Sequence, residues 1–140
     1  MPLYENYKHR ELTSKILKAF YTVYNRLGYG FLEKVYENAL IIELRRMGLR
    51  CEQQVPITVY YEGEVVGNFR ADILVEGIVI LELKAAEAIC QSDEAQLVNY
   101  LRATDIEVGL LLGFCPKPET RRRVYENSRK KLSTPTQQPN

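Results

Sequence analysis

The stretch Phe69-Arg70-Ala71-Asp72-Ile73-Leu74-Val75-Glu76-Gly77-Ile78-Val79-Ile80-Leu81-Glu82-Leu83-Lys84 decides the fold. Two runs rich in Ile, Leu and Val flank the turn signal Glu76-Gly77, and this pattern predicts a β-hairpin. Three charged residues interrupt the apolar runs: Asp72, Glu82 and Lys84. A charge inside a buried strand is costly unless it is paired or binds a metal. The hairpin therefore carries both a fold prediction and a candidate site.

The turn decides whether Asp72 and Glu82 meet. A two-residue turn at Glu76-Gly77 would place the two carboxylates on opposite sides of the sheet. A three-residue loop, Glu76-Gly77-Ile78 with Gly77 in the left-handed region, or a bulge near Asp72, would place Asp72 opposite or diagonal to Glu82. A shared metal requires this odd register, whereas a purely structural ion-pair cluster does not.

Length and composition limit the class of protein. The chain has 140 residues and a net charge of +1, which suits one domain with a core and no overall bias toward polyanions. No window approaches the roughly 18 apolar residues of a membrane span, and the first residues lack a secretory signal. Three widely spaced cysteines and a single histidine, His9, argue against zinc sites, disulfide frameworks and Ser/His triads. We therefore expect a cytoplasmic protein with no membrane partner.

The rest of the chain predicts an α/β domain. Apolar residues at helical spacing predict helices over residues 8–27, 31–47 and 93–103, the last capped by Ser92. Strands are predicted over 51–61, from about Val65 through the hairpin, and over 108–114, which is nearly all apolar and typical of a strand buried on both faces. Strand, helix and strand between residues 78 and 114 form a βαβ unit. We predict a mixed central sheet flanked by helices.

The segment after residue 114 is basic. Residues 117–131 contain seven Lys or Arg and two Glu, so their net charge is 7 − 2 = +5. A short helix or a final strand is expected near Val124. Arg121, Arg122 and Arg123 are candidate contacts to a phosphate backbone, although basic runs are more often solvated surface. Residues 133–140 lack an apolar anchor and are predicted to form a disordered tail after a single domain spanning residues 1–132.

Two further polar residues lie on predicted helices. Glu33 precedes Tyr36 by three residues and Leu40 by seven, so it is aligned with buried positions rather than with solvent. Two interpretations stay open for Glu33: a helix-start carboxylate that interacts with the helix dipole, or a functional acid. Gln96 and Tyr100 form a ridge on the third helix at a spacing of four residues.

Together, Asp72, Glu82 and Lys84 would suit phosphodiester hydrolysis. Mg²⁺ prefers oxygen ligands, usually one or two carboxylates with water and phosphate oxygens. Such a metal lowers the pKa of a bound water and stabilises the charge of the transition state. The lysine would orient or deprotonate the water or hold the phosphate, and the Leu83 carbonyl would be a further oxygen ligand. The spacing is loose, so an ordinary ion pair at a sheet margin remains an alternative.

Several stretches resemble the GxxExxY family of small bacterial and archaeal proteins. The resemblance rests on Gly30-Phe31-Leu32-Glu33-Lys34-Val35-Tyr36, Phe69 to Val75, Leu81 to Ala85, Glu94 to Leu101 and Gly109 to Phe114. It covers about residues 12–124. That family is placed in the PD-(D/E)xK nuclease-like superfamily, which implies a restriction-endonuclease-like fold. Arg70-Ala71-Asp72 replaces the literal Pro-Asp dipeptide, a motif that is lax across the superfamily.

The resemblance implies a role for each candidate residue. Asp72 and Glu82 would be metal ligands, Lys84 the catalytic lysine, and Glu33 an additional acid at the metal. Gln96 would orient Lys84 or the water. The implied cofactor is Mg²⁺ or Mn²⁺, and the implied reaction is hydrolysis of nucleic acid, with DNA favoured over RNA.

Two matters stay open at this point. The alternative function is a non-catalytic module that retains the nuclease fold and binds nucleic acid or a protein. A homodimer rests on analogy alone, because small nucleases of this fold often act as dimers on two strands.

Overall fold

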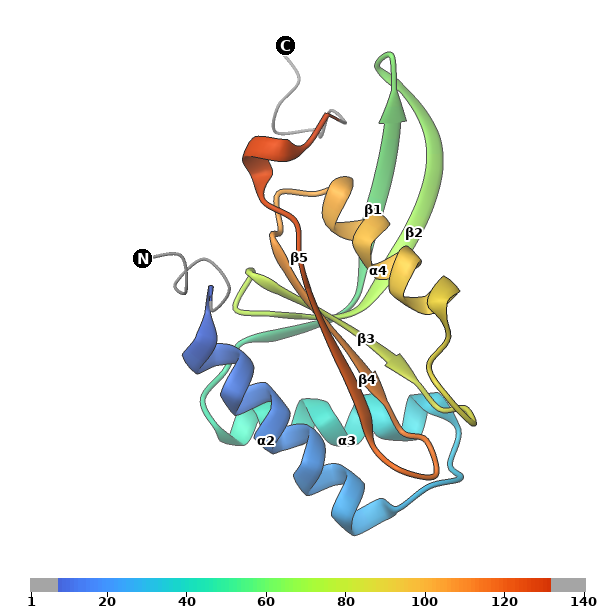
Figure 1. Ribbon diagram of the computed structural model, residues 1–140. Helices are drawn as coiled ribbons and strands as arrows, with labels where there is room; N and C mark the ends of the chain where they lie inside the picture. Colours follow the sequence, from blue (N-terminus) through green and yellow to red (C-terminus); the bar gives the residue numbers. More distant parts are fainter. Residues whose placement is uncertain (1–7, 132–140) are drawn as a thin grey trace.

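The computed structural model describes residues 8–131 as an α/β domain (Figure 1). The expected tail at 133–140 lies outside the described residues. The elements in chain order are α2 (Arg10–Leu27), α3 (Glu33–Arg46), β1 (Cys51–Tyr61), β2 (Glu64–Val75), β3 (Val79–Lys84), α4 (Gln91–Arg102), β4 (Val108–Gly113), β5 (Glu119–Val124) and the 3-10 turn η1 (Asn127–Arg129). No helix within these residues has the length and apolar character needed to cross a membrane.

The sheet confirms the predicted mixed topology. Its five strands lie in the order β1-β2-β3-β4-β5. β3 and β4 are parallel, and each of the other neighbouring pairs is antiparallel. All six residues of β4 are buried, as its apolar sequence predicts. The basic segment after residue 114 forms the edge strand β5, one of the two forms expected there.

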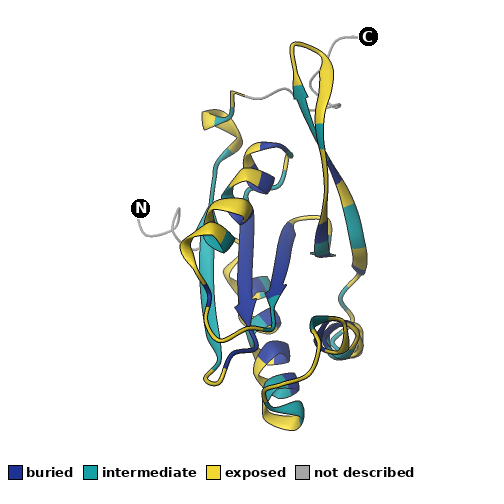
Figure 2. Ribbon diagram, turned by 90° about the vertical axis from the view of Figure 1, so that its right-hand side faces the viewer, coloured by how far each residue is buried: buried dark blue, intermediate teal, exposed yellow. Residues whose placement is uncertain are grey.

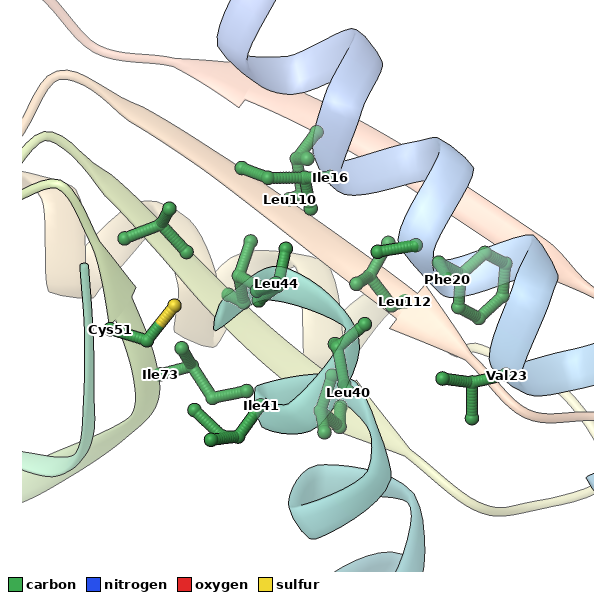
Figure 3. Close-up of a cluster of buried hydrophobic side chains, with 14 of the residues drawn as sticks. Ile16, Phe20, Val23, Leu40, Ile41, Leu44, Cys51, Ile73, Leu110 and Leu112 are labelled. Carbon is green, nitrogen blue, oxygen red and sulfur yellow. The ribbon is translucent and has the colours of Figure 1, made fainter. Parts of the chain in front are cut away.

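Helices cover both faces of the sheet. α2 and α3 bury Phe20, Leu40 and Leu44 against one face, where they share a core with Leu110 and Leu112 of β4 (Figure 3). α4 covers the opposite face through a second core that includes Leu97, Leu101, Ile80 and Leu111. Since β3 and β4 contribute to both cores, they are the most buried part of the sheet (Figure 2).

A glycine sets the close approach of α4 to β4. A Cβ atom added to Gly109 would lie 2.6 Å from Cδ1 of Leu97. Leu97 is fully buried, so its side chain has little room to move aside. The glycine therefore fixes the distance between α4 and the sheet, and with it the position of the polar residues that follow along α4.

α4 begins earlier than predicted. The N-cap is Cys90 and the first helical residue is Gln91, so the expectation that Ser92 caps the helix is wrong. Asp93 explains the shift, because its Oδ2 accepts a hydrogen bond of 3.0 Å from the backbone N–H of Cys90. A carboxylate at the third helical residue that accepts the N–H of the N-cap residue caps the N-terminus of the helix.

β1 and β2 run together beyond the point where β2 leaves β3. The pairing of β2 with β3 ends at Ile73 and Leu81, whereas β1 and β2 stay paired to Tyr61 and Glu64. The outer part of these two strands projects past α4 (Figure 1) and is largely exposed (Figure 2). We call this part, residues 55–71, the β1–β2 ribbon.

The strand pair twists sharply at Asp72. Ile73 and Val75 belong to the core beneath α2 and α3, but Ala71 belongs to the core beneath α4. Residues two apart share a face in a flat strand, so this exchange of faces requires a strong local twist. On β1, Gln54 lies between Gln53 and Val55, the partners of Ile73 and Ala71, and has φ 53°, in the left-handed region.

Candidate active site

The hairpin adopts the odd register that a shared site requires. Val75 pairs with Val79 and Ile73 with Leu81, so the loop has three residues, Glu76-Gly77-Ile78. Gly77 has φ 69°, in the left-handed region, as the three-residue loop predicts. This register places Asp72 opposite Glu82.

Asp72 and Glu82 hydrogen-bond to each other's strands where β2 and β3 separate. The backbone N–H of Asp72 donates to Oε2 of Glu82 at 2.9 Å. In return, the backbone N–H of Leu83 donates to Oδ2 of Asp72 at 2.8 Å. The carboxylates thus replace the backbone carbonyls that a continuing ladder would supply. Each of these hydrogen bonds engages one oxygen of its carboxylate.

The two carboxylates share a poorly solvated environment. Burial, reinforced by repulsion from Asp72, raises the pKa of Glu82 to about 8. Burial also raises the pKa of Asp72, against the opposing effect of the hydrogen bond from the Leu83 N–H. Two adjacent carboxylates that resist ionisation together are strongly stabilised by a positive charge between them.

Lys84 lies on the same face of β3 as Glu82 and pairs with an acid that the sequence analysis missed. Its Nζ lies 3.4 Å from Oδ1 of Asp93, in the first turn of α4. Burial alone would lower the pKa of Lys84, but the carboxylates of Asp93 and Glu33 outweigh burial and raise it. Lys84 is therefore a cation at neutral pH and suits charge stabilisation better than proton abstraction.

Glu33 is the first residue of α3 and belongs electrostatically to the same site. Burial raises its pKa, repulsion from Asp72 adds to this effect, and attraction to Lys84 opposes it. Glu33 therefore starts α3 and interacts electrostatically with Asp72 and Lys84, and its role as a functional acid stays a prediction.

Tyr36 explains how Glu33 is positioned. Its hydroxyl donates to the Gly28 carbonyl at 2.6 Å and accepts from the Phe31 N–H at 3.1 Å. Its ring stacks on Phe114, with centroids 4.0 Å apart and planes inclined by 14°. The tyrosine fixes the joint between α2 and α3 from the core side, and the joint sets where α3 starts.

Glu37 is a buried acid beside the site that the sequence analysis also missed. It is 3 % exposed and accepts hydrogen bonds from Lys34, Gln53 and Gln54 at 2.9, 2.7 and 2.9 Å. It lies one turn after Glu33, and that spacing of four residues was the available signal. Its three donors satisfy the carboxylate, so Glu37 holds β1 against α3.

Gln96 hydrogen-bonds to Tyr100, which lies near the carboxylates of the site. Its amide donates to the Tyr100 hydroxyl at 2.5 Å. Burial raises the pKa of Tyr100, and the charges of Glu82 and Asp72 raise it further. Within residues 8–131 the hydrogen-bond partner of Gln96 is Tyr100 and the ion-pair partner of Lys84 is Asp93, so the expected link between Gln96 and Lys84 is not direct.

The three candidate arginines of β5 do not share a face. Arg121 and Arg123 pair with Glu94 of α4. Arg122 points to the opposite face, where its Nη2 donates to the Lys8 carbonyl at 2.5 Å. Strand alternation separates Arg122 from its neighbours.

The two carboxylates of the site fit a metal ion whose remaining ligands come from substrate and water. In the part of the chain that the structure describes, no group of three or more His, Cys, Asp and Glu side chains is arranged to hold a metal ion. Asp72 and Glu82 offer two carboxylates, which is the usual protein contribution to a Mg²⁺ site at a phosphate. Oxygen donors suit Mg²⁺ or Mn²⁺, whereas a closed structural zinc site would require nitrogen or sulfur.

Comparison with known proteins agrees with this architecture. No curated protein matches the chain. Among solved structures, the one described as the crystal structure of SSO0001 is similar in fold, with a TM-score of 0.53 and 18 % sequence identity. The match covers 67 % of this chain and 50 % of that one, so it spans half the length of the solved protein. The model of the PD-(D/E)XK nuclease superfamily matches residues 10–124, and the chain therefore belongs to that superfamily.

Proposed function

We propose that this protein is a divalent-metal-dependent nuclease that hydrolyses phosphodiester bonds, with DNA as the preferred substrate. One observation carries the proposal: at the split between β2 and β3, the Glu82 carboxylate accepts the Asp72 N–H and the Asp72 carboxylate accepts the Leu83 N–H, next to Lys84 on β3. Membership of the nuclease superfamily supports the reaction class. The narrower GxxExxY assignment, a homodimer and a cytoplasmic location remain predictions.

Asp72 and Glu82 would hold Mg²⁺ or Mn²⁺, with Glu33 as a further acid at the start of α3. When bound, such a metal activates a water and stabilises negative charge on the phosphate. Lys84, kept protonated by Asp93 and Glu33, holds the phosphate and stabilises the charge that develops on it. The oxygen of water bonds to phosphorus while the bond from phosphorus to the leaving sugar oxygen breaks. One proton of the water ends on the leaving oxygen, which becomes a hydroxyl, and the other stays on the phosphate monoester or passes to solvent.

Residues outside the carboxylate pair would position the substrate. The Gln96 amide and the Tyr100 hydroxyl hydrogen-bond to each other, and both would contact the substrate from the α4 side of the site. Arg121 and Arg123 lie on the face that α4 covers and would approach the phosphate backbone, whereas Arg122 is turned away. Contacts of this kind contribute affinity that falls with salt concentration.

The test is cleavage of plasmid, linear duplex and single-stranded DNA, and of RNA, with Mg²⁺ or Mn²⁺ and with EDTA. We expect metal-dependent cleavage that Lys84→Ala lowers at least about a hundredfold. Cleavage that survives in Lys84→Ala would contradict the proposal. Binding without turnover, indifferent to Asp72→Ala, would support the non-catalytic module instead.

A further inference from the structure

A groove lies between α4 and the β1–β2 ribbon, next to the carboxylate site. Its volume is about 560 Å³, within the range of pockets that bind ligands. Gln96 and Tyr100 of α4 line it, and the charges of Asp72 and Glu82 act on Tyr100. Ser92 also lines the groove and directly precedes Asp93, the ion-pair partner of Lys84, so the groove lies beside the candidate active site.

Phe69 forms the aromatic wall of the groove. Its side chain is 45 % exposed, and its ring centroid lies 5.9 Å from that of Tyr100. The ring covers Gly67, where an added Cβ atom would lie 2.9 Å from Cε2 of Phe69. Gly67 and Tyr100 thus hold the ring in place while much of it stays open to the groove. A fixed and exposed aromatic ring is a stacking platform for nucleobases.

The opposite wall supplies hydrogen-bonding groups. Gln96 and Asn99 contribute amides, and Arg102 contributes a guanidinium that donates to Asn99 Oδ1 at 3.3 Å. None of the described residues that line the groove is acidic. Apolar walls, amide edges and one cation match a nucleobase, which has two apolar faces, a hydrogen-bonding edge and an anionic backbone.

A base can enter such a groove only when it is unpaired. In a duplex both faces of each base are stacked, and enzymes reach them by unstacking or by using a single strand. We propose that the groove binds an unpaired base next to the scissile phosphate, so that the preferred substrate has a single-stranded segment at or beside the cleaved bond. This inference rests on the proposed function, since it names the substrate class of the same site.

The experiment measures binding and cleavage separately. Fluorescence anisotropy in EDTA compares a fluorescein-labelled gapped duplex with a fully paired duplex of the same sequence. We expect the wild type to bind the gapped duplex about tenfold more tightly, Phe69→Ala to lose this preference, and Phe69→Tyr to keep it. Val65→Ala is the matched control, because Val65 is 53 % exposed on the same two strands but does not line the groove.

The outcomes separate this inference from the proposed function. Equal affinity of the wild type for both duplexes, or equal losses in Phe69→Ala and Val65→Ala, would overturn the inference. A Phe69-dependent dimer in sedimentation, with no preference for gapped DNA, would also overturn it and assign the groove to a second copy of the chain. Phe69-dependent binding without any metal-dependent cleavage would support the groove while contradicting the nuclease activity.

Discussion

The two ends of the β2–β3 pairing are built differently. At the closed end, Val75 and Val79 pair beside a three-residue loop and both side chains are fully buried. At the open end, the ladder stops after Ile73 and Leu81, and carboxylates take over the backbone hydrogen bonds. The closed end gains stability from apolar burial, whereas the open end keeps charge in a poorly solvated place. Within one hairpin, packing and chemistry are therefore separated by only a few residues.

The largest expected effect comes from neutralising the open end. Asp72→Asn keeps an oxygen that accepts the Leu83 N–H, so the fold should persist. It removes a charge at the proposed metal, and we expect cleavage to fall about a thousandfold or more. Calorimetry should show little metal binding while thermal unfolding stays cooperative. A variant that binds Mg²⁺ or Mn²⁺ as tightly as the wild type would count against the assignment of Asp72.

Removing an apolar side chain from the last pair of the ladder, Ile73 and Leu81, should have the opposite effect. Leu81→Ala removes a side chain that is 0 % exposed, and we expect a loss of about 2–5 kcal/mol in the free energy of unfolding. At a temperature where the variant is still folded, its metal affinity should stay near that of the wild type. Urea unfolding and calorimetry measure the two quantities. Destabilisation below about 1 kcal/mol would show that packing at Leu81 matters less than its burial indicates.

Glu82, at the open end, should make the stability of the fold depend on pH. Its pKa in the folded state, about 8, lies above the ordinary value of 4.5, so the folded state binds the proton more tightly. Stability from this group is present below pH 4.5 and is lost as pH rises through 8, by roughly 5 kcal/mol without metal. Glu82→Gln should flatten this decline and stabilise the metal-free protein at pH 9. Chemical unfolding of both proteins between pH 5 and 9 tests this, and parallel profiles would contradict it.

The smallest effect is expected at the turn. Gly77 has φ 69°, and a Cβ atom there would meet no other atom within 4 Å. Gly77→Ala should therefore cost about 1 kcal/mol from backbone strain alone, with cleavage unchanged. Thermal unfolding measures the cost, and Gly63→Ala at the β1–β2 turn, with φ 79°, is the matched control. A large loss of activity in Gly77→Ala alone would show that the register of the hairpin had slipped.

Much of this architecture could be predicted from local patterns. Alternation and apolar runs predicted the mixed sheet and the buried β4. A site shared by Asp72 and Glu82 required an odd register, but the sequence left open whether the hairpin adopts it. The contacts of Asp93 with Lys84 and of Glu37 with Gln53 could not be predicted, because they depend on how neighbouring elements pack against each other in three dimensions. The split of Arg121 and Arg122 between two faces also depended on whether the basic segment formed a helix or a strand. When a local sequence allows both a helix and a strand, pairing with the edge of the sheet determines that it forms a strand.

Tyr36 has a consequence for how the sequence signature of this chain is understood. Its hydroxyl ties two backbone positions of the α2–α3 joint, and its ring rests on Phe114 at the end of β4. Tyr36 thus fixes the position of Glu33, three residues earlier in the chain, relative to the core. In the pattern formed by Gly30, Glu33 and Tyr36, the glutamate is the acidic residue and the tyrosine is the residue that positions it. A substitution that moves Tyr36 would then shift Glu33 without changing the charge of any residue in the candidate site.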